Sequence, residues 1–214
     1  MAALFITFEG TEGCGKSTQI EMLAVRLRAL ARKVITLREP GGTPIGEEIR
    51  HTLKHSRNNA AMTPKAELLL MNASRAQLVR EVIQPALARG DTVLCDRFYD
   101  STIAYQGYGR GLPLPEVRAI IDFAVGATVP DLTLLLRVSL ECSEERRRQR
   151  QANLPHLRDR MEEADRAFFG RVAAGYEALA LEQPHRIKVV EAEKAAADVH
   201  EQIWEFVQQR LACP

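Results

Sequence analysis

The chain has 214 residues, 46% of them hydrophobic, and its formal net charge at pH 7 is +1. This length suits one well-buried α/β domain covering residues 1–214, and no linker-like or highly charged block suggests a second domain. The balanced charge gives no overall attraction to nucleic acid or to an anionic membrane, and the longest apolar runs are far too short to span a bilayer. We therefore expect neither nucleic acid nor a membrane as a partner.

The cysteines and the first residues indicate the cellular compartment. Cys14, Cys95, Cys142 and Cys213 show no C-x-x-C spacing and no nearby histidine, so neither a disulfide framework nor a zinc site is expected. Residues 1–4 lack the basic flank of a secretory signal. We therefore expect a reduced, cytoplasmic protein.

Short β-branched runs alternate with longer helical patterns along the chain. The predicted strands cover residues 4–8, 33–37, 92–95, 132–138 and 186–190. The predicted helices cover residues 16–31, 64–89, 115–125, 139–151, 162–182 and 195–211. Such alternation requires crossover connections, so we expect an α/β fold with a mostly parallel five-stranded sheet, helices on both of its faces, and ligands at the carboxyl ends of the strands.

A phosphate loop directly follows the first predicted strand. Residues 10–17 read Gly-Thr-Glu-Gly-Cys-Gly-Lys-Ser, which is a complete G-x-x-x-x-G-K-S/T motif. Its backbone N–H groups can face nucleotide phosphates, Lys16 can reach the outer phosphates, and the Ser17 hydroxyl can hold a magnesium ion. The amphipathic helix that follows adds a favourable N-terminal dipole, a context that a chance match in a glycine turn would not have. The predicted nucleotide-binding residues are Gly10, Gly13, Cys14, Gly15, Lys16, Ser17 and Thr18.

The loops after the second and third predicted strands carry candidate ligands. Arg38 ends the second strand, where a guanidinium can grip a phosphate, and a surface pair with Glu39 is the alternative. Arg50 is a further candidate for phosphate binding. Asp96 ends the third strand, where phosphate-loop enzymes place a carboxylate that holds magnesium, although aspartate also caps helices. The next residue, Arg97, is expected to face the ligand crevice.

Two helical segments place side chains one turn apart. Thr102 and Gln106 are four residues apart beside Tyr105, so they share one face of any short helix there. Met71 and Arg75 have the same spacing in the predicted helix 64–89. The alternatives are an ordinary solvated helix face and, for Arg75, an exposed cation that covers the edge of the core.

The densest charge lies between residues 144 and 163. This region contains Arg146, Arg148 and Arg150, but acidic residues are interspersed in it and the aromatic residues that stack on bases are missing, which argues against a nucleic-acid surface. We expect a mobile lid over about residues 142–160 that closes arginines over a triphosphate and excludes water.

Together these motifs resemble bacterial thymidylate kinase, one of the nucleoside monophosphate kinases. The matching segments are residues 8–17, 38–43, 96–97, 104–107, 130–133 and 159–162. The resemblance extends over nearly the whole chain, and the Arg-Glu-Pro-Gly-Gly-Thr and Ala-Tyr-Gln-Gly segments are its most specific parts. The resemblance implies a P-loop kinase fold, often homodimeric, that transfers the γ-phosphoryl group of MgATP to dTMP.

The resemblance also implies which residues bind the acceptor. The expected dTMP-binding residues are Glu12, Arg38, Arg50, Met71, Arg75, Arg97, Thr102, Tyr105 and Gln106. In the family pattern Glu12 contacts the deoxyribose 3′-hydroxyl. The acceptor phosphate is held by Arg38, Arg50 and Arg97. Arg75 contacts the edge of the thymine, and Thr102 and Gln106 also contact the base. Tyr105 lies under the sugar. This region spans about residues 38–110.

The same resemblance implies the catalytic and metal-binding residues. The expected catalytic residues are Lys16, Arg97, Arg146, Arg148 and Arg150, and those expected to hold magnesium are Ser17 and Asp96. Cys14 is uncharged where another subtype has a basic residue, so the catalytic arginine is expected from the lid, with Arg150 favoured. Two positions depart from the pattern: Met71 replaces a phenylalanine that stacks on thymine, and Arg137 stands where the fourth strand often ends in aspartate.

Two other functions remain as alternatives. A GTPase-like switch would need a guanine-reading Asn-Lys-x-Asp sequence and a D-x-x-G motif, and both are absent. A kinase for a deoxynucleoside or for another nucleoside monophosphate is the alternative among enzymes. The acceptor-side arginines favour an anionic acceptor, and the identity of its base depends mainly on the resemblance.

Overall fold

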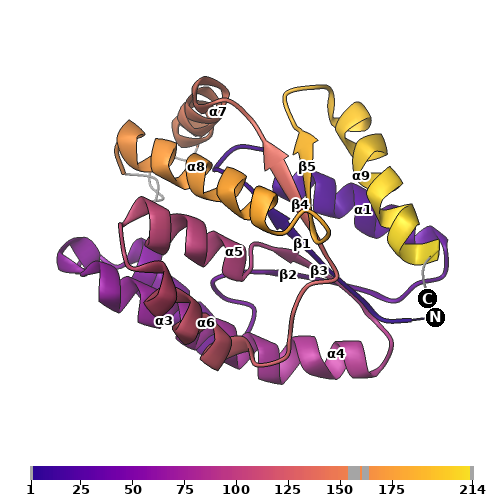
Figure 1. Cartoon of the computed structure of the whole chain (residues 1–214), viewed down its shortest axis with the longest axis horizontal. Coiled ribbons are helices and arrows are strands. Elements are labelled where there is room, and N and C mark those ends of the chain that lie inside the picture. The colour runs from indigo at the N-terminus through magenta and orange to yellow at the C-terminus, as the bar shows by residue number, and fades with distance from the viewer. Residues whose placement is uncertain (1, 154–159, 161–163, 213–214) are drawn as a thin grey trace.

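The computed structural model describes residues 2–153, 160 and 164–212, with the backbone alone at residues 150, 151 and 153. Over this part of the chain, parallel strands form a single sheet in the order β2-β3-β1-β4-β5 (Figure 1). The strands are β1 (Leu4–Glu9), β2 (Val34–Arg38), β3 (Thr92–Asp96), β4 (Leu132–Arg137) and β5 (Ile187–Glu191). The predicted parallel five-stranded sheet is therefore confirmed.

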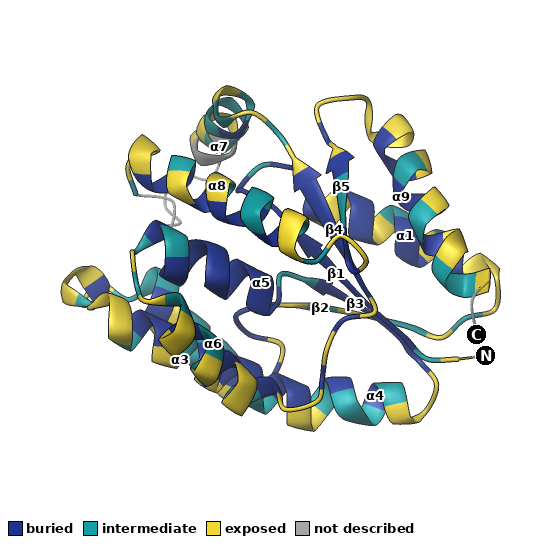
Figure 2. Ribbon diagram, in the orientation of Figure 1, coloured by how far each residue is buried: buried dark blue, intermediate teal, exposed yellow. Residues whose placement is uncertain are grey.

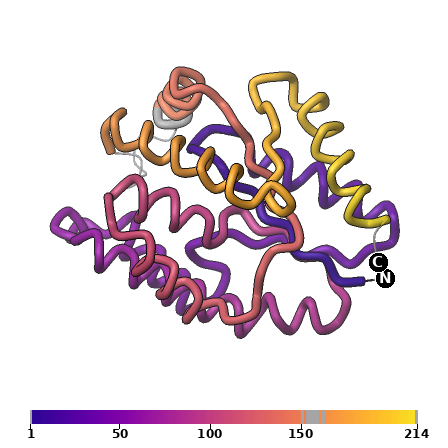
Figure 3. The backbone as a smooth tube through the Cα atoms, in the orientation of Figure 1, coloured from indigo at the N-terminus to yellow at the C-terminus, as the bar shows by residue number. Residues whose placement is uncertain are grey.

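Helices cover both faces of the sheet, as predicted. They are α1 (Lys16–Ala29), α2 (Pro44–Arg50), α3 (Pro64–Leu78), α4 (Gln84–Ala88), α5 (Tyr99–Thr102), α6 (Leu114–Val125), α7 (Leu140–Asn153), α8 (Arg166–Glu182) and α9 (Ala196–Ala212). Shorter helical turns are η1 (His51–His55), η2 (Asn59–Ala61), η3 (Val79–Ile83) and η4 (Ile103–Gly109). Figure 3 shows α9 running beside α1, although the two helices lie at opposite ends of the sequence.

The core is divided between the two faces of the sheet. Because side chains of a strand alternate between its faces, Phe5 packs with residues of α3, α6 and α8, whereas Ile6 packs with residues of α1 and α9. Every residue of β1 is buried, as expected for a central strand covered on both sides (Figure 2). This rigid centre holds the loops that leave the carboxyl ends of the strands.

The strand register brings three of these loops together. Phe8 of β1 and Arg38 of β2 are both aligned with Asp96 of β3. The phosphate loop after β1, the loop after β2 and the turn after β3 therefore leave the sheet side by side. This edge is where an open α/β sheet binds its ligands.

The structure also corrects the predicted elements. The predicted helix 64–89 is two α-helices joined by the π-helical turn η3, and the helix predicted to reach residue 31 ends at Ala29, since Ala31 has a left-handed φ of 58°. The helix predicted from residue 162 begins at Arg166, because the Asp165 side chain caps it by accepting a hydrogen bond from Phe168 N at 2.7 Å.

Some helical segments are absent from the predicted helices, among them the one that follows β2. Helix α2 and the turn η1 fill residues 44–55, a range with no predicted helix and with Arg50 as its only predicted site residue. The Thr43 side chain caps α2 by accepting from Gly46 N at 3.0 Å, and Pro44 occupies the first helical position. The glycines at 41, 42 and 46 hid this signal, because they are typical of loops.

The predicted lid lies partly within the described chain. Helix α7 carries its first part, residues 154–159 lie outside the described residues, and Arg160 is described. Of the matching segment 159–162, only Arg160 is therefore placed. No helix in the described ranges is both long and apolar enough to cross a membrane.

Candidate active site

The phosphate loop has the backbone geometry that its sequence predicts. Gly10, Gly13 and Gly15 have φ values of 133°, 76° and 99°. At Gly10 a Cβ atom would lie 2.4 Å from the Leu136 carbonyl oxygen, so only glycine fits this crossing against β4. The buried Lys16 folds over the loop, and its Nζ donates to the Thr11 carbonyl oxygen at 3.1 Å.

Two adjoining hollows open at this edge of the sheet. The inner hollow is lined by Met71, Arg75, Thr102, Tyr105 and Gln106, with Pro40 and Ser101. The phosphate-loop hollow is lined by Gly13, Gly15, Lys16, Ser17, Thr18, Arg38, Arg50 and Asp96. Both hollows share Glu12, Glu39, Lys54 and Arg97. The structure thus brings most of the predicted residues into one continuous site.

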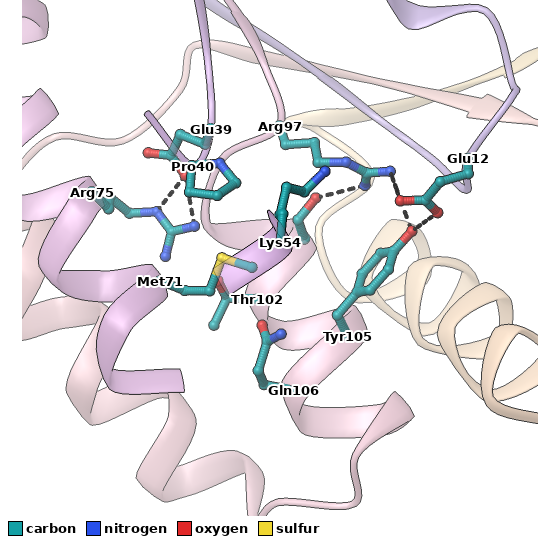
Figure 4. Close-up of a pocket in the computed structure, with 11 residues that line it drawn as sticks. Glu12, Glu39, Pro40, Lys54, Met71, Arg75, Arg97, Thr102, Tyr105 and Gln106 are labelled. Carbon is teal, nitrogen blue, oxygen red and sulfur yellow. Dashed lines mark hydrogen bonds and ion pairs between the residues drawn. The ribbon is translucent and has the colours of Figure 1, made fainter. Parts of the chain in front are cut away.

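Arg97 lies at the junction of the hollows in a dense network of hydrogen bonds. Its Nη2 donates to Glu12 Oε1 at 3.0 Å, and its Nη1 donates to Ser101 Oγ and to the Tyr176 hydroxyl, both at 3.0 Å. The Tyr105 hydroxyl donates to the other oxygen of Glu12 (Figure 4). Arg97 has a left-handed φ of 69°, which is uncommon for a non-glycine residue and aims its side chain into the junction.

Charge decides the protonation state of Glu12. Burial alone would raise the pKa of this carboxyl, but the cations Arg97 and Lys16 outweigh burial and lower the pKa to about 2. Burial also holds the pKa of the Tyr105 hydroxyl well above its ordinary value. At neutral pH Glu12 is therefore an ionised acceptor and Tyr105 a neutral donor.

Glu9, at the end of β1, supports this junction from behind. Its fully buried carboxylate accepts from Phe98 N at 2.8 Å, from Ser101 Oγ at 2.5 Å and from the Tyr176 hydroxyl at 2.9 Å. Ser101 and Tyr176 are the same groups that accept from Arg97. Burial, followed by the nearby Asp100, raises the pKa of Glu9 to about 7.

Arg75 is buried, so the alternative of an exposed rim cation is wrong. Its side chain is 2% exposed, its Nε donates to Glu39 Oε2 at 2.8 Å, and its Nη1 donates to Asn72 Oδ1 at 3.0 Å. The alternative pairing of Arg38 with Glu39 is also wrong, because Arg38 forms its ion pair with Glu47 at 3.0 Å. Figure 4 shows Arg75 between Glu39 and Met71 on one side of the inner hollow.

Ser17 and Asp96 meet beside the phosphate loop. Ser17 Oγ donates to Asp96 Oδ2 at 3.2 Å, and both side chains line the phosphate-loop hollow. Hydroxyl and carboxylate oxygens are the hard ligands that Mg²⁺ prefers. No group of three or more His, Cys, Asp or Glu residues suited to a metal occurs in the part of the chain that the structure describes.

The predicted lid arginines differ in their positions. Arg146 Nη1 donates to the Gly13 carbonyl oxygen of the phosphate loop at 3.1 Å. Arg148 is exposed and pairs with Glu145 on its own helix. The side chain of Arg150 lies outside the described part of the chain, so its predicted role is not tested.

Three further predicted positions have specific surroundings. Cys14 is buried, and Lys16 Nζ donates to its Sγ at 3.5 Å. Arg50 donates to the Pro40 carbonyl oxygen at 2.9 Å. Arg137, where an aspartate is common, pairs with Glu191 on the neighbouring strand and with Glu177 at 3.3 Å. A carboxylate thus lies at this edge, although it comes from β5 rather than β4.

Several residues of the site were not predicted from the sequence. Lys54 lines both hollows but belongs to the unpredicted turn η1, so no signal identified it. Glu9, Glu39 and Glu67 are buried acids, and a single sequence does not show which charged residues are buried. Glu9 directly follows the apolar part of the first predicted strand, and Glu39 follows Arg38 at the end of the second, but neither position alone indicates burial.

Comparison with known proteins gives consistent results. A family model described as thymidylate kinase matches residues 8–203. The chain is 45% identical to the thymidylate kinase of Chlorobium luteolum, over 97% of this chain and 98% of that protein. It is 45% identical to the thymidylate kinase of Deinococcus radiodurans, over 97% of each chain. Among solved structures, thymidylate kinase from Ehrlichia chaffeensis matches with a TM-score of 0.77 and 30% identity, over 97% of this chain and 100% of that one.

Proposed function

Because this chain belongs to the thymidylate kinase family, we propose that it transfers the γ-phosphoryl group of ATP to dTMP, giving dTDP and ADP. The observation that carries this proposal is the pair of adjoining hollows that share Glu12, Lys54 and Arg97. One hollow contains the phosphate loop and the other contains a buried arginine and an amide. Two substrates bound there would meet at Arg97.

The donor side is built for polyphosphate. Backbone N–H groups of residues 10–17 and the ammonium of Lys16 bind the β- and γ-phosphates. Ser17 and Asp96 would hold Mg²⁺, which when bound neutralises charge on the phosphate oxygens. An oxygen of the acceptor phosphate attacks the γ-phosphorus, and the bond from that phosphorus to the bridging oxygen of ADP breaks.

The acceptor side provides cations for phosphate and a polar wall for the base. Arg38, Arg50 and Arg97 bind the dTMP phosphate. Glu12 is ionised, so it accepts a hydrogen bond from the deoxyribose 3′-hydroxyl. The ring of Tyr105 lies under the sugar, where a 2′-hydroxyl would be crowded.

The base occupies the inner hollow. Arg75 donates to a carbonyl oxygen of thymine, and Thr102 and Gln106 contact the ring edge. Met71 packs on the ring as an adaptable apolar side chain, so affinity for the base depends more on the polar contacts than it would with a stacked phenylalanine.

The remaining features of the proposal concern the lid, the assembly and the compartment. Arginines of the lid stabilise the charge on the moving phosphoryl group, and the position of Arg146 beside Gly13 supports α7 as their source. We further propose a homodimer in the cytoplasm. Three described cysteines are free thiols, as suits a reducing compartment.

The test is an assay of ADP release with MgATP and a panel of nucleoside monophosphates. We expect dTMP to give the highest kcat/KM, with dUMP lower and dCMP, dAMP and dGMP much lower. Higher turnover of another monophosphate, or of a deoxynucleoside, would contradict the proposal. Light scattering of the purified protein checks the dimer.

A further inference from the structure

Glu67 of α3 is a buried carboxylate behind the wall of the inner hollow. It is 0% exposed and accepts hydrogen bonds from three residues: Gln106 of η4, Arg110 at the end of that turn, and Arg160. Gln106 Nε2 donates to its Oε1 at 2.8 Å, Arg110 Nη2 donates to its Oε2 at 3.1 Å, and Arg160 Nη1 donates to its Oε2 at 2.5 Å. Of these partners, Gln106 lines the hollow.

The surroundings of Glu67 favour its ionised form. Burial opposes ionisation, but the hydrogen bonds from Arg110, Gln106 and Arg160 outweigh burial, and the pKa of Glu67 lies below its ordinary value. An ionised carboxylate accepts hydrogen bonds and cannot donate one. Glu67 therefore requires the NH₂ group of Gln106, and not the carbonyl, to face it.

This requirement also determines where the carbonyl oxygen of the Gln106 side chain points. With Nε2 turned toward Glu67, Gln106 presents its Oε1 to the inner hollow, and no described residue donates to that oxygen. Figure 4 shows the amide end of Gln106 pointing into the space beside Met71 and Thr102. Across the hollow, the Arg75 guanidinium offers only donors. The inner hollow therefore has a hydrogen-bond acceptor, Gln106 Oε1, and a hydrogen-bond donor, the Arg75 guanidinium, in fixed positions.

We propose that Glu67 is a positioning residue that locks the Gln106 amide with its carbonyl oxygen toward the base and so selects pyrimidines with an N–H at ring position 3. This inference rests on the proposed function. Thymine and uracil carry that N–H beside a carbonyl oxygen at position 4, which matches Gln106 and Arg75. Cytosine carries an unprotonated N3 beside an amino group, so both contacts would be mismatched.

The alternative role for Glu67 is to neutralise Arg110 and Arg160 without any influence on the base. The two roles differ in one measurable ratio, kcat/KM for dUMP divided by kcat/KM for dCMP. These substrates differ only at N3 and at position 4 of the ring. A structural defect lowers both values together, whereas a freed Gln106 amide changes their ratio.

The first variant is Glu67→Gln, which keeps the shape of the side chain. Its carboxamide both donates and accepts, so the Gln106 amide can turn over. We expect the dUMP/dCMP ratio to fall at least tenfold, while KM for ATP changes less than threefold. The matched control is Glu81→Gln, because Glu81 also accepts from a glutamine, Gln77 at 2.8 Å, but in an exposed pair. This control should keep the wild-type ratio.

The second variant exchanges the two residues, Glu67→Gln with Gln106→Glu. The pair keeps its net charge, and the carboxylate at position 106 presents an acceptor to the base whichever way it turns. We expect this double variant to recover the dUMP/dCMP ratio to within threefold of wild type.

Two results would overturn the inference. One is a folded Glu67→Gln protein with the wild-type ratio, and the other is a folded exchange variant as unselective as the single variant. If Glu67→Gln does not fold, the same ratio is measured for Glu67→Asp, whose shorter side chain draws the carboxylate away from Gln106 Nε2, and an unchanged ratio in that variant would equally overturn the inference. Failure of the wild-type protein to phosphorylate dTMP would instead overturn the proposed function.

Discussion

Lys16 is the lysine of the phosphate-loop motif. Its ammonium contacts the Gly10 and Thr11 carbonyl oxygens at 3.3 and 3.1 Å. Lys16→Ala should therefore lower kcat at least ~10²-fold through lost charge stabilisation and leave the fold intact. Circular dichroism and ADP release measure the two effects. Near-normal turnover by a folded variant would contradict the role of the loop.

Arg75 has two roles that must be separated. Arg75→Ala should reduce kcat/KM for dTMP by about tenfold to a hundredfold, because a charge-assisted hydrogen bond is worth about 1.5–3 kcal/mol. It should also lower the free energy of unfolding by about 3–5 kcal/mol, because it leaves the Glu39 carboxylate buried without its cation.

A companion variant distinguishes these effects. Adding Glu39→Gln to Arg75→Ala removes the unpaired charge, so the free energy of unfolding should recover by more than about 1 kcal/mol. Use of dTMP should stay low, because the base still lacks its donor. Urea unfolding and steady-state kinetics give the two quantities. Recovery of both together would mean that Arg75 acts only through stability.

At the scale of an element, α7 is the predicted source of the catalytic arginine. Arg150→Ala should lower kcat about 10³-fold or more with little change in the dissociation constant of either substrate, because such an arginine acts mainly in the transition state. Lysine should rescue only partly, since a point charge cannot bridge two phosphate oxygens. Single-turnover kinetics would measure this.

Parallel variants at Arg146 and Arg148 complete the test. Arg146 contacts the phosphate loop, whereas Arg148 is exposed and pairs with Glu145, so the latter should have the smaller effect. Loss of kcat in Arg146→Ala with retention in Arg150→Ala would move the role to Arg146. Three silent variants would contradict the lid mechanism as a whole.

The elements differ in how far the sequence reveals them. The strands were predicted to within two residues, because each is a short apolar run with clear ends. Helix α2 and η1 were missed, because seven- and five-residue elements bury few apolar side chains and glycines precede them. Lys54 was missed with them. The local pattern of apolar and polar residues thus predicts the longer elements, but not short ones such as α2 and η1.

Some residues of the candidate site could likewise be predicted from the sequence, and others could not. The phosphate loop and Asp96 were identified because a motif and a strand end mark them. The burial of Arg75 and its pairing with Glu39 were not predicted, because the two residues are 36 apart in sequence and meet only in the folded chain. Charge in a sequence indicates chemistry, but the partner of a charge depends on the tertiary fold.

For the whole molecule, Glu9 links folding to pH because it joins β1, the turn after β3 and α8. Its pKa of about 7 exceeds the ordinary value of 4.5, so the folded protein holds this proton more tightly than the unfolded chain. The contribution of Glu9 to stability is thus largest below pH 4.5 and is lost as the pH rises through 7.

In the Glu9→Gln variant, residue 9 cannot ionise, so the variant should not lose stability as the pH rises through 7. Its unfolding free energy relative to wild type should therefore rise between pH 5 and 7, by at most about 1.4 kcal/mol per pH unit. Urea unfolding of both proteins across that range checks the slope. Parallel profiles would mean that Glu9 does not titrate there, and any constant offset would report only the altered hydrogen bonds.

The shared lining of the two hollows has a consequence for ligand design. Because Glu12, Lys54 and Arg97 belong to both, the hollows adjoin through these side chains. A single molecule that joins a thymidine to an adenosine through a polyphosphate bridge would lose translational and rotational freedom only once. With a bridge matched to the span, its avidity should exceed that of either half by about 10²–10⁴. The length of the best bridge would then measure the distance between the bound substrates.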